Sequence, residues 1–173
     1  GGIIKRGIPA ITGVRQESAM EVLTEIARKQ SAPLYRMGDH FRVRRSKGAL
    51  FTYFGIQETW HHMTTALPGK HQLQNAALTL AACELLNMQN LASLPLEAIR
   101  TGLSHNHWPG RLEVVCQSPY VILDGAHNLA AARNLADYLA VEMKDRKITM
   151  VMGILDDKPY HAILKSLLSV CHR

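Results

Sequence analysis

The feature that most constrains the fold of this 173-residue chain is a repeated order of short apolar run, small-residue turn and helical pattern. Residues 8–12 form an apolar run that ends at Gly13, and apolar side chains then recur at helical spacing over residues 17–30. A second short apolar run occupies residues 34–37. A helix between two short strands predicts the crossover connection of a parallel sheet.

Residues 40–63 have a different character, because short β-rich stretches alternate there with glycines. This pattern predicts a small antiparallel meander. Stretches rich in alanine and leucine then predict helices over residues 72–86 and 95–103. The polar, turn-forming residues 104–110 predict a domain boundary.

The pattern of strands and helices restarts after this boundary. The predicted elements are strands at 112–116, 121–123 and 148–152 and helices near 127–144 and 159–170. Such alternation is typical of a doubly wound parallel sheet. We therefore predict an α/β fold with one domain over residues 1–106 and the start of a second over residues 107–173.

The composition is that of an ordinary globular protein with an excess of basic residues. Hydrophobic residues make up 47% of the chain and charged residues 20%, which excludes a disordered or coiled-coil chain. The net charge of +6 suits nucleic acid, a membrane surface or a polyanionic small molecule. The densest basic run has the every-second spacing of a solvated strand face and a following turn. It consists of Arg42, Arg44, Arg45 and Lys47.

The length of the apolar runs and the spacing of the cysteines indicate an intracellular, cytoplasmic protein. No window reaches the roughly 18 uncharged apolar residues of a membrane span. Cys83, Cys116 and Cys171 are odd in number and far apart, which predicts reduced thiols. The adjacent His61 and His62 point to opposite faces of a strand, so we expect no metal site built from this chain.

The most informative stretch is an apolar strand at 121–123 that ends in Asp124 and Gly125 before a helix. In open α/β sheets, ligands bind beyond the carboxyl ends of strands, where a helix start offers unpaired N–H groups. A carboxylate at Asp124 can accept two adjacent hydroxyls, as on a ribose, with His127 beside it. The alternative is that Asp124 only caps the helix.

Two further residues are candidates for nucleotide recognition. Arg111 follows a rigid Pro109–Gly110 turn, and a guanidinium fixed in this way suits phosphate oxygens. The alternative is a surface arginine paired with Glu113. Asn75 lies about one turn into an apolar helix, where its amide can contact a purine edge, although it can equally be an ordinary exposed helix residue.

Four motifs, taken together and in this order, resemble the folylpolyglutamate synthase/dihydrofolate synthase branch of the Mur ligase superfamily. They are Gly2–Pro9, Gly69–Gln72 with Asn75–Ala77, Pro109–Glu113 and Asp124–Asn128. Muramyl ligases and cyanophycin synthetase more often carry Asp-Tyr-Ala-His in the last motif, so Gly125 favours the folate branch. The sequence departs from the family at Leu129, where proline is usual.

The resemblance implies a fold and a reaction. Residues 1–106 would be the C-terminal part of the central ATP-binding domain, and residues 107–173 the N-terminal part of a Rossmann-like C-terminal glutamate ligase domain. ATP would phosphorylate a carboxylate of dihydropteroate or of a folate glutamate tail, and the amine of L-glutamate would displace phosphate to form an amide. The implied cofactors are ATP and Mg²⁺, and the implied partners are small molecules: ATP, L-glutamate and dihydropteroate or folates.

The resemblance also implies roles for individual residues. Asn75 would contact the adenine, Arg111 the phosphates and Asp124 the ribose of ATP. His127 would line the same cleft as the candidate catalytic residue. Because these residues come from both sides of the boundary near His105, domain closure would assemble the nucleotide site.

Other parts of the family's machinery are not in this sequence. The chain contains no G-x-x-x-x-G-K-[ST] P-loop, and the Mg²⁺ ligands are expected upstream. We therefore expect a fragment that is inactive alone, binds neither nucleic acid nor membrane, and is prone to self-association through exposed sheet edges. The alternatives are another amide ligase of the superfamily, such as a muramyl ligase or cyanophycin synthetase, and a non-catalytic nucleotide-binding or assembly module.

Overall fold

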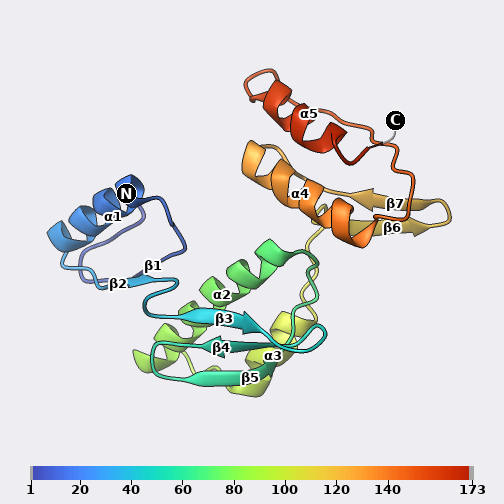
Figure 1. Ribbon diagram of the computed structural model, residues 1–173. Helices are drawn as coiled ribbons and strands as arrows, with labels where there is room; N and C mark the ends of the chain where they lie inside the picture. Colours follow the sequence, from blue (N-terminus) through green and yellow to red (C-terminus); the bar gives the residue numbers. More distant parts are fainter. Residues whose placement is uncertain (1, 172–173) are drawn as a thin grey trace. The chain divides into compact units, whose positions relative to one another are not determined.

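The structure is a computed structural model that describes residues 2–171 (Figure 1). It divides into two compact units. The first consists of Gly1–Ala66 and Gln72–Asn106, and the second of Leu67–His71 and His107–Arg173. The short segment Leu67–His71 therefore belongs with the later half of the chain, although it precedes most of a helix of the first unit.

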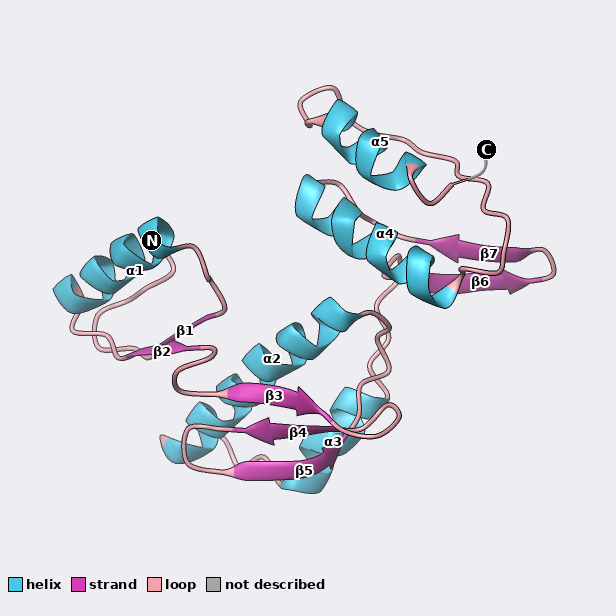
Figure 2. Cartoon of the chain, viewed as in Figure 1, coloured by secondary structure: helices cyan, strands magenta, loops and turns pink. Residues whose placement is uncertain are grey.

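The first unit begins with a strand, a helix and a second strand. Strands β1 (Ala10–Thr12) and β2 (Leu34–Arg36) are parallel, and helix α1 (Glu17–Lys29) connects them (Figure 2). The buried Ala27 of α1 packs with Ile4 in a small apolar cluster beneath this connection. The predicted crossover is confirmed.

The rest of the first unit is a meander covered by two helices. Strands β3 (Arg42–Arg45), β4 (Phe51–Phe54) and β5 (Thr59–Met63) form an antiparallel sheet in that order. Helices α2 (Lys70–Met88) and α3 (Leu96–Ser104) lie behind it in Figure 1. The core joins one face of the sheet to both helices because large side chains of the sheet meet small side chains of α2. Its members include Phe51, Tyr53, Trp60, Met63, Ala76, Ala77, Leu80, Ala81, Ile99 and Leu103.

A buried carboxylate fixes the loop between β4 and β5. Glu84 of α2 is 1% exposed and accepts four hydrogen bonds. The donors are Tyr53 Oη (2.7 Å) and the backbone N–H groups of Ile56 (2.9 Å), Gln57 (2.7 Å) and Glu58 (2.7 Å). Burial and the hydrogen bond to Glu84 raise the pKa of Tyr53, so its phenol stays protonated and donates.

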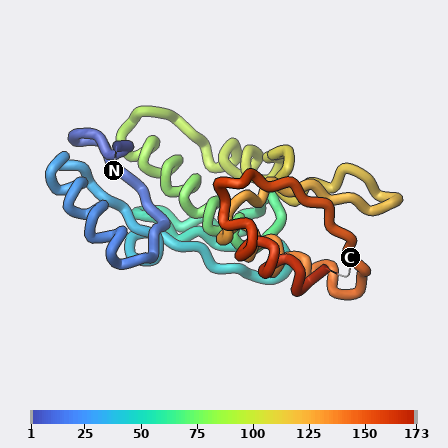
Figure 3. The backbone as a smooth tube through the Cα atoms, turned by 90° about the horizontal axis from the view of Figure 1, so that it is seen from above, coloured from blue at the N-terminus to red at the C-terminus, as the bar shows by residue number. Residues whose placement is uncertain are grey.

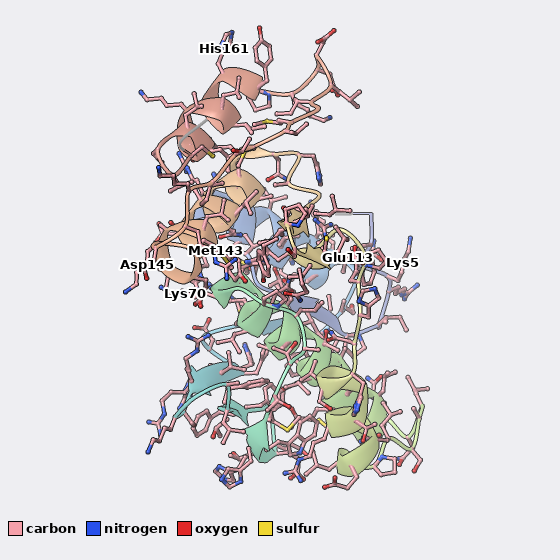
Figure 4. All side chains as sticks on the ribbon, turned by 90° about the vertical axis from the view of Figure 1, so that its right-hand side faces the viewer. Lys5, Lys70, Glu113, Met143, Asp145 and His161 are labelled. Atoms are coloured by element: carbon pink, nitrogen blue, oxygen red, sulfur yellow. The ribbon has the colours of Figure 1, made fainter. Side chains whose placement is uncertain are left out.

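The second unit contains a hairpin and two helices. Strands β6 (Glu113–Gln117) and β7 (Tyr120–Leu123) are antiparallel. Helices α4 (Leu129–Glu142) and α5 (Tyr160–Leu168) pack on each other through Ala132, Ala136, Ile163 and Leu167. They lie side by side in Figure 1, and in the view from above α5 lies in front of α4 (Figure 3). His161 is on the outer side of α5 and points away from α4 (Figure 4). The mixed α/β fold class is confirmed.

One predicted strand does not form. Residues 148–152 lie in the loop between α4 and α5 (Figure 2), and the three sheets of the described residues do not include them. Val151 is 97% exposed, whereas Met150 packs against the cluster between α4 and α5. A parallel strand needs a neighbouring strand to pair its backbone groups, and here the apolar run packs part of its length on helices instead.

Candidate functional site

The turn ahead of β6 holds Arg111 in a constrained backbone. Gly110 has φ +67° and Leu112 has φ +50°. A positive φ is costly for a bulky residue such as Leu112, by about 1–3 kcal/mol, and persists only where the surroundings enforce it. Burial of the Leu112 side chain, which is 4% exposed, is one such constraint. A 2.7 Å hydrogen bond from Gly110 N–H to Glu113 Oε2 is another.

Asp124 ties this turn to the end of β7. Its Oδ2 accepts the backbone N–H of Leu112 at 3.0 Å, and its Oδ1 accepts that of Ala126 at 2.9 Å. The N–H of Gly125 donates to the carbonyl of Gly110 at 2.7 Å, so a second bond joins the same two segments. Each carboxylate oxygen has two acceptor positions, so each retains one for a ligand hydroxyl.

Asp124 is not the cap of the following helix. Asn128 takes that role, because its Oδ1 accepts the N–H of Ala131 at 2.9 Å. The helix then begins at Leu129, the position where the sequence departs from the family pattern. The alternative interpretation of Asp124 as a helix cap is therefore wrong.

The guanidinium of Arg111 lies over the backbone of Gly125. A Cβ placed on Gly125 would be 3.5 Å from Arg111 Nη1 and 3.4 Å from the carbonyl oxygen of Gly110. Glu113, the alternative partner, instead accepts Gly110 N–H and lies 3.6 Å from His107 Nε2. Within residues 2–171 no ion pair joins Arg111 to Glu113. The turn thus places the Arg111 guanidinium beside the backbone of Gly125, which has no side chain.

His127 is exposed, and one ring nitrogen is engaged. Its Nδ1 lies 2.9 Å from the carbonyl oxygen of Gly125. A carbonyl oxygen only accepts, so Nδ1 must carry the proton of this hydrogen bond. In the neutral ring, Nε2 then has a lone pair and can accept a proton.

His71 joins this group, although the sequence interpretation gave it no role. Gly69 has φ +102°, and a Cβ there would lie 2.8 Å from His71 Cε1 and 3.4 Å from Leu112 Cδ1. The segment Leu67–His71 therefore packs on the turn that holds Arg111. Burial lowers the pKa of His71 below 6.5, with Asp124 opposing the shift and Arg111 adding to it. The only signal in the sequence was its place in the Gly69–Gln72 motif.

Asn75 lies in the other unit. It is exposed on α2, and its Nδ2 donates to Gln72 Oε1 at 2.9 Å. The structure thus brings Arg111, Asp124 and His127 together in the second unit, with His71, whereas Asn75 belongs to the first. The meeting of Asn75 with the other three around one nucleotide stays a prediction.

Three further observations concern the described part of the chain. Among residues 2–171, no group of three or more His, Cys, Asp or Glu side chains is placed to hold a metal ion. Cys83, Cys116 and Cys171 are all free thiols. None of the helices in this range has the length and apolar character to span a membrane.

Comparisons with known proteins identify close relatives. Residues 110–172 match the family described as Mur ligase, glutamate ligase domain. The dihydrofolate synthase/folylpolyglutamate synthase of Bacillus subtilis is 38% identical over 175 residues, which include 99% of this chain and 41% of that protein. The chain thus spans about 41% of the length of this curated relative.

Solved structures give the same result. The folylpolyglutamate synthase of Mycobacterium tuberculosis complexed with ADP matches with a TM-score of 0.89 and 33% identity, over 98% of this chain and 39% of that one. A structure described as an FPGS–AMPPCP–folate complex matches with a TM-score of 0.89 and 32% identity, over 98% of this chain and 42% of that one.

Proposed function

We propose that this chain, which belongs to the folylpolyglutamate synthase/dihydrofolate synthase branch of the Mur ligase superfamily, supplies nucleotide-binding residues to an ATP-dependent glutamate ligase. The acceptor is dihydropteroate or a folate with its glutamate tail. Residues 1–106 are the C-terminal part of the central ATP-binding domain, and residues 107–173 begin the glutamate ligase domain. The activity and its substrates are proposed for the whole protein, because the chain spans about 41% of its curated relative.

The observation that carries this proposal is the placement of Arg111 and Asp124 on two segments that hydrogen bonds join. Arg111 lies on a turn fixed by Asp124, and its guanidinium stands over Gly125. A guanidinium cannot lose its charge and can bind two phosphate oxygens at once. We assign the phosphates to Arg111, the ribose hydroxyls to the unused acceptor positions of Asp124, and the adenine to Asn75.

The chemistry proposed for the whole protein has two steps. The terminal phosphoryl group of ATP passes to a carboxylate oxygen of the acceptor, giving an acyl phosphate and ADP. The amine of L-glutamate then attacks the acyl carbon; a C–N bond forms, the C–O bond to phosphate breaks, and the amine loses a proton. Arg111 offsets charge on the transferred group. His127, the candidate catalytic residue, offers Nε2 to the released proton.

A requirement for Mg²⁺ is implied by the resemblance and remains an expectation. Residues 2–171 contain no triad of side chains that fits Mg²⁺, so they are not assigned to it. None of the roles given to Arg111, Asp124, Asn75 and His127 requires contact with the metal. A cytoplasmic location is part of the proposal, and the free thiols support it.

Self-association of the 173-residue polypeptide is also part of the proposal. Val114, Val115, Val121 and Leu123 are exposed on the β6–β7 hairpin, and Val151 and Leu155 are exposed in the loop that follows α4. Exposed apolar surface of this kind favours association. Sedimentation velocity over a range of concentrations tests this, and a monomer at all of them contradicts it.

The nucleotide site is tested by titrating the ¹⁵N-labelled chain with ADP. We expect the amide signals of Gly110, Gly125 and Ala126 to move. Arg111→Gln is expected to weaken ADP binding about tenfold, because a charge-assisted bidentate contact is lost. The matched control is Arg133→Gln, which removes an exposed charge from α4. Equal loss in both variants, or no movement of these signals, contradicts the assignment.

The inactivity of the isolated polypeptide is tested by ATP-dependent incorporation of labelled glutamate. Without a P-loop, this chain lacks the backbone cradle that aligns a triphosphate. We expect incorporation at background level, and turnover above background contradicts the proposal.

A further inference from the structure

Two arginines share one aromatic ring on the exposed face of the meander. Arg42 lies directly opposite Phe54 in the register of β3 and β4, and Arg44 follows two residues later on the same face. The Arg42 guanidinium carbon is 4.8 Å from the centre of the Phe54 ring, and that of Arg44 is 5.7 Å away. Both are within the range of a cation–π contact.

This face of the sheet carries a concentration of positive charge. Arg42 and Arg44 are exposed, as are Arg45 and Lys47 beside them. The ion pairs found within residues 2–171 join other side chains and leave these four out. Two guanidinium groups held on one ring repel each other, and a bound anion would relieve that repulsion.

Phe54 lies close to both guanidinium groups and so holds them in the same part of the sheet. The N–H donors of a guanidinium lie in one plane in a fixed fork. These donors match the two oxygens of a carboxylate. β3 is an outer strand of its sheet and pairs only with β4 among the described residues. Arg42 and Arg44 therefore lie at the edge of the sheet.

The spacing of the arginines fits an acidic chain whose carboxylates recur at nearly the same distance, and a γ-linked glutamate chain has this property at every successive residue. Alternate residues of a strand are about 6.6–6.8 Å apart. In a γ-linked glutamate chain, five backbone bonds separate successive α-carbons. A peptide unit with three such bonds spans at most about 3.3–3.6 Å, so the five bonds span about 6 Å when extended. Each unit carries one α-carboxylate, so successive carboxylates have nearly the spacing of Arg42 and Arg44.

We propose that the Arg42–Arg44 face binds a γ-linked oligoglutamate and holds two successive α-carboxylates of it. This inference rests on the proposed function, in which such a chain is the tail of the substrate and product. The site would bind the α-carboxylates of the growing tail and would make no contact with the pteridine.

Nucleic acid fits this face less well. Single-stranded nucleic acid binds through bases that stack on open aromatic faces and through many cations that follow the backbone. The Phe54 ring already has arginines over it, and the basic run contains four residues.

The test is a titration of the 173-residue chain with γ-linked pentaglutamate at about 0.05 M salt, where surface charges are weakly screened. We expect shifts at Arg42, Arg44 and Phe54. The double variant R42Q/R44Q should weaken binding about tenfold. The matched control R133Q/K144Q removes two exposed charges elsewhere and should change binding less than about twofold. Thermal unfolding of each variant confirms that it is folded.

Several outcomes would overturn the proposal. One is equal weakening by R42Q/R44Q and R133Q/K144Q. Another is binding of α-linked pentaglutamate as tight as that of the γ-linked chain, because the face would then recognise any chain of carboxylates and not the γ-linked chain in particular. A third is tighter binding of oligothymidylate than of oligoglutamate at the same residues. If the chain binds oligoglutamate but not ADP, the proposed function is contradicted and this site stays supported. If it binds ADP but not oligoglutamate, only this site is overturned.

Discussion

Asp124 accepts the backbone N–H of Leu112 at 3.0 Å, and this bond joins the end of β7 to the turn that presents Arg111. Leu112 sits at φ +50°, a conformation that a leucine keeps only under constraint. One carboxylate therefore fixes the backbone on which the proposed phosphate ligand stands. Its oxygens keep acceptor positions for the proposed ribose contact, so the turn and the proposed nucleotide site depend on one side chain.

Asp124→Asn is expected to lower the free energy of unfolding by about 1–3 kcal/mol. Asparagine has one acceptor oxygen, so its NH₂ group must face the N–H of either Leu112 or Ala126. Urea denaturation measures the change, with Asp137→Asn on the exposed side of α4 as the matched control. If the two variants unfold alike, Asp124 does not hold the turn.

Local periodicity was enough to predict the first unit. The order of β1, α1 and β2, the meander and both covering helices follow from apolar spacing and from glycine positions. In the site, Arg111 was proposed because it follows the Pro109–Gly110 turn, and Asp124 because it ends an apolar run ahead of a small-residue turn and a helix. Their mutual arrangement, through Leu112 and Gly110, joins segments more than ten residues apart, and no local pattern contains it.

The errors have the same cause. The run at 148–152 has the composition of a strand, but pairing depends on a neighbour that the local sequence does not specify. His71 was overlooked because about forty residues separate it from Arg111, and the packing of Gly69 on Leu112 is a tertiary contact. The acceptor positions of Glu84 are likewise filled by a loop distant in sequence.

Leu129→Pro is expected to be tolerated, with a change in unfolding free energy within about 1 kcal/mol. Leu129 is the first residue of α4, where a missing N–H breaks no helical hydrogen bond and a fixed φ suits the helix. Asn128→Ala, by contrast, removes the cap and should cost about 0.5–2 kcal/mol. Chemical denaturation compares the two, and a proline variant less stable than the alanine variant contradicts this account of the helix start.

His71 should make the second unit less stable in mild acid. Because burial lowers its pKa from 6.5, the unfolded chain takes up a proton at higher pH than the folded chain. Its contribution is fully present above pH 6.5 and is lost as the pH falls toward the lowered pKa. His71→Gln removes this dependence, so the drop in unfolding free energy between about pH 7.5 and about pH 5.5 should be smaller than in the wild type. NMR titration of the His71 Cε1 proton provides the direct check, and a midpoint at or above 6.5 contradicts it.

The stability of the first unit depends on Glu84, which binds the loop at residues 55–58, and on Gly55, which leaves room for the Glu84 carboxylate. A Cβ on Gly55 would overlap the Glu84 carboxylate and the Tyr53 ring, so Gly55→Ala should destabilise by about 1–3 kcal/mol. Glu84→Gln keeps the shape but places an NH₂ group at one oxygen position; if it faces the Tyr53 hydroxyl, which can accept, the Ile56 N–H still loses its acceptor, which should cost about 1–3 kcal/mol. Gly102→Ala is the matched control: it lies inside α3 with nothing within 4 Å of the added methyl, and should stabilise by about 0.5–1 kcal/mol. Equal effects of the two glycine substitutions on thermal unfolding would mean that the loop at residues 55–58 is not held by Glu84.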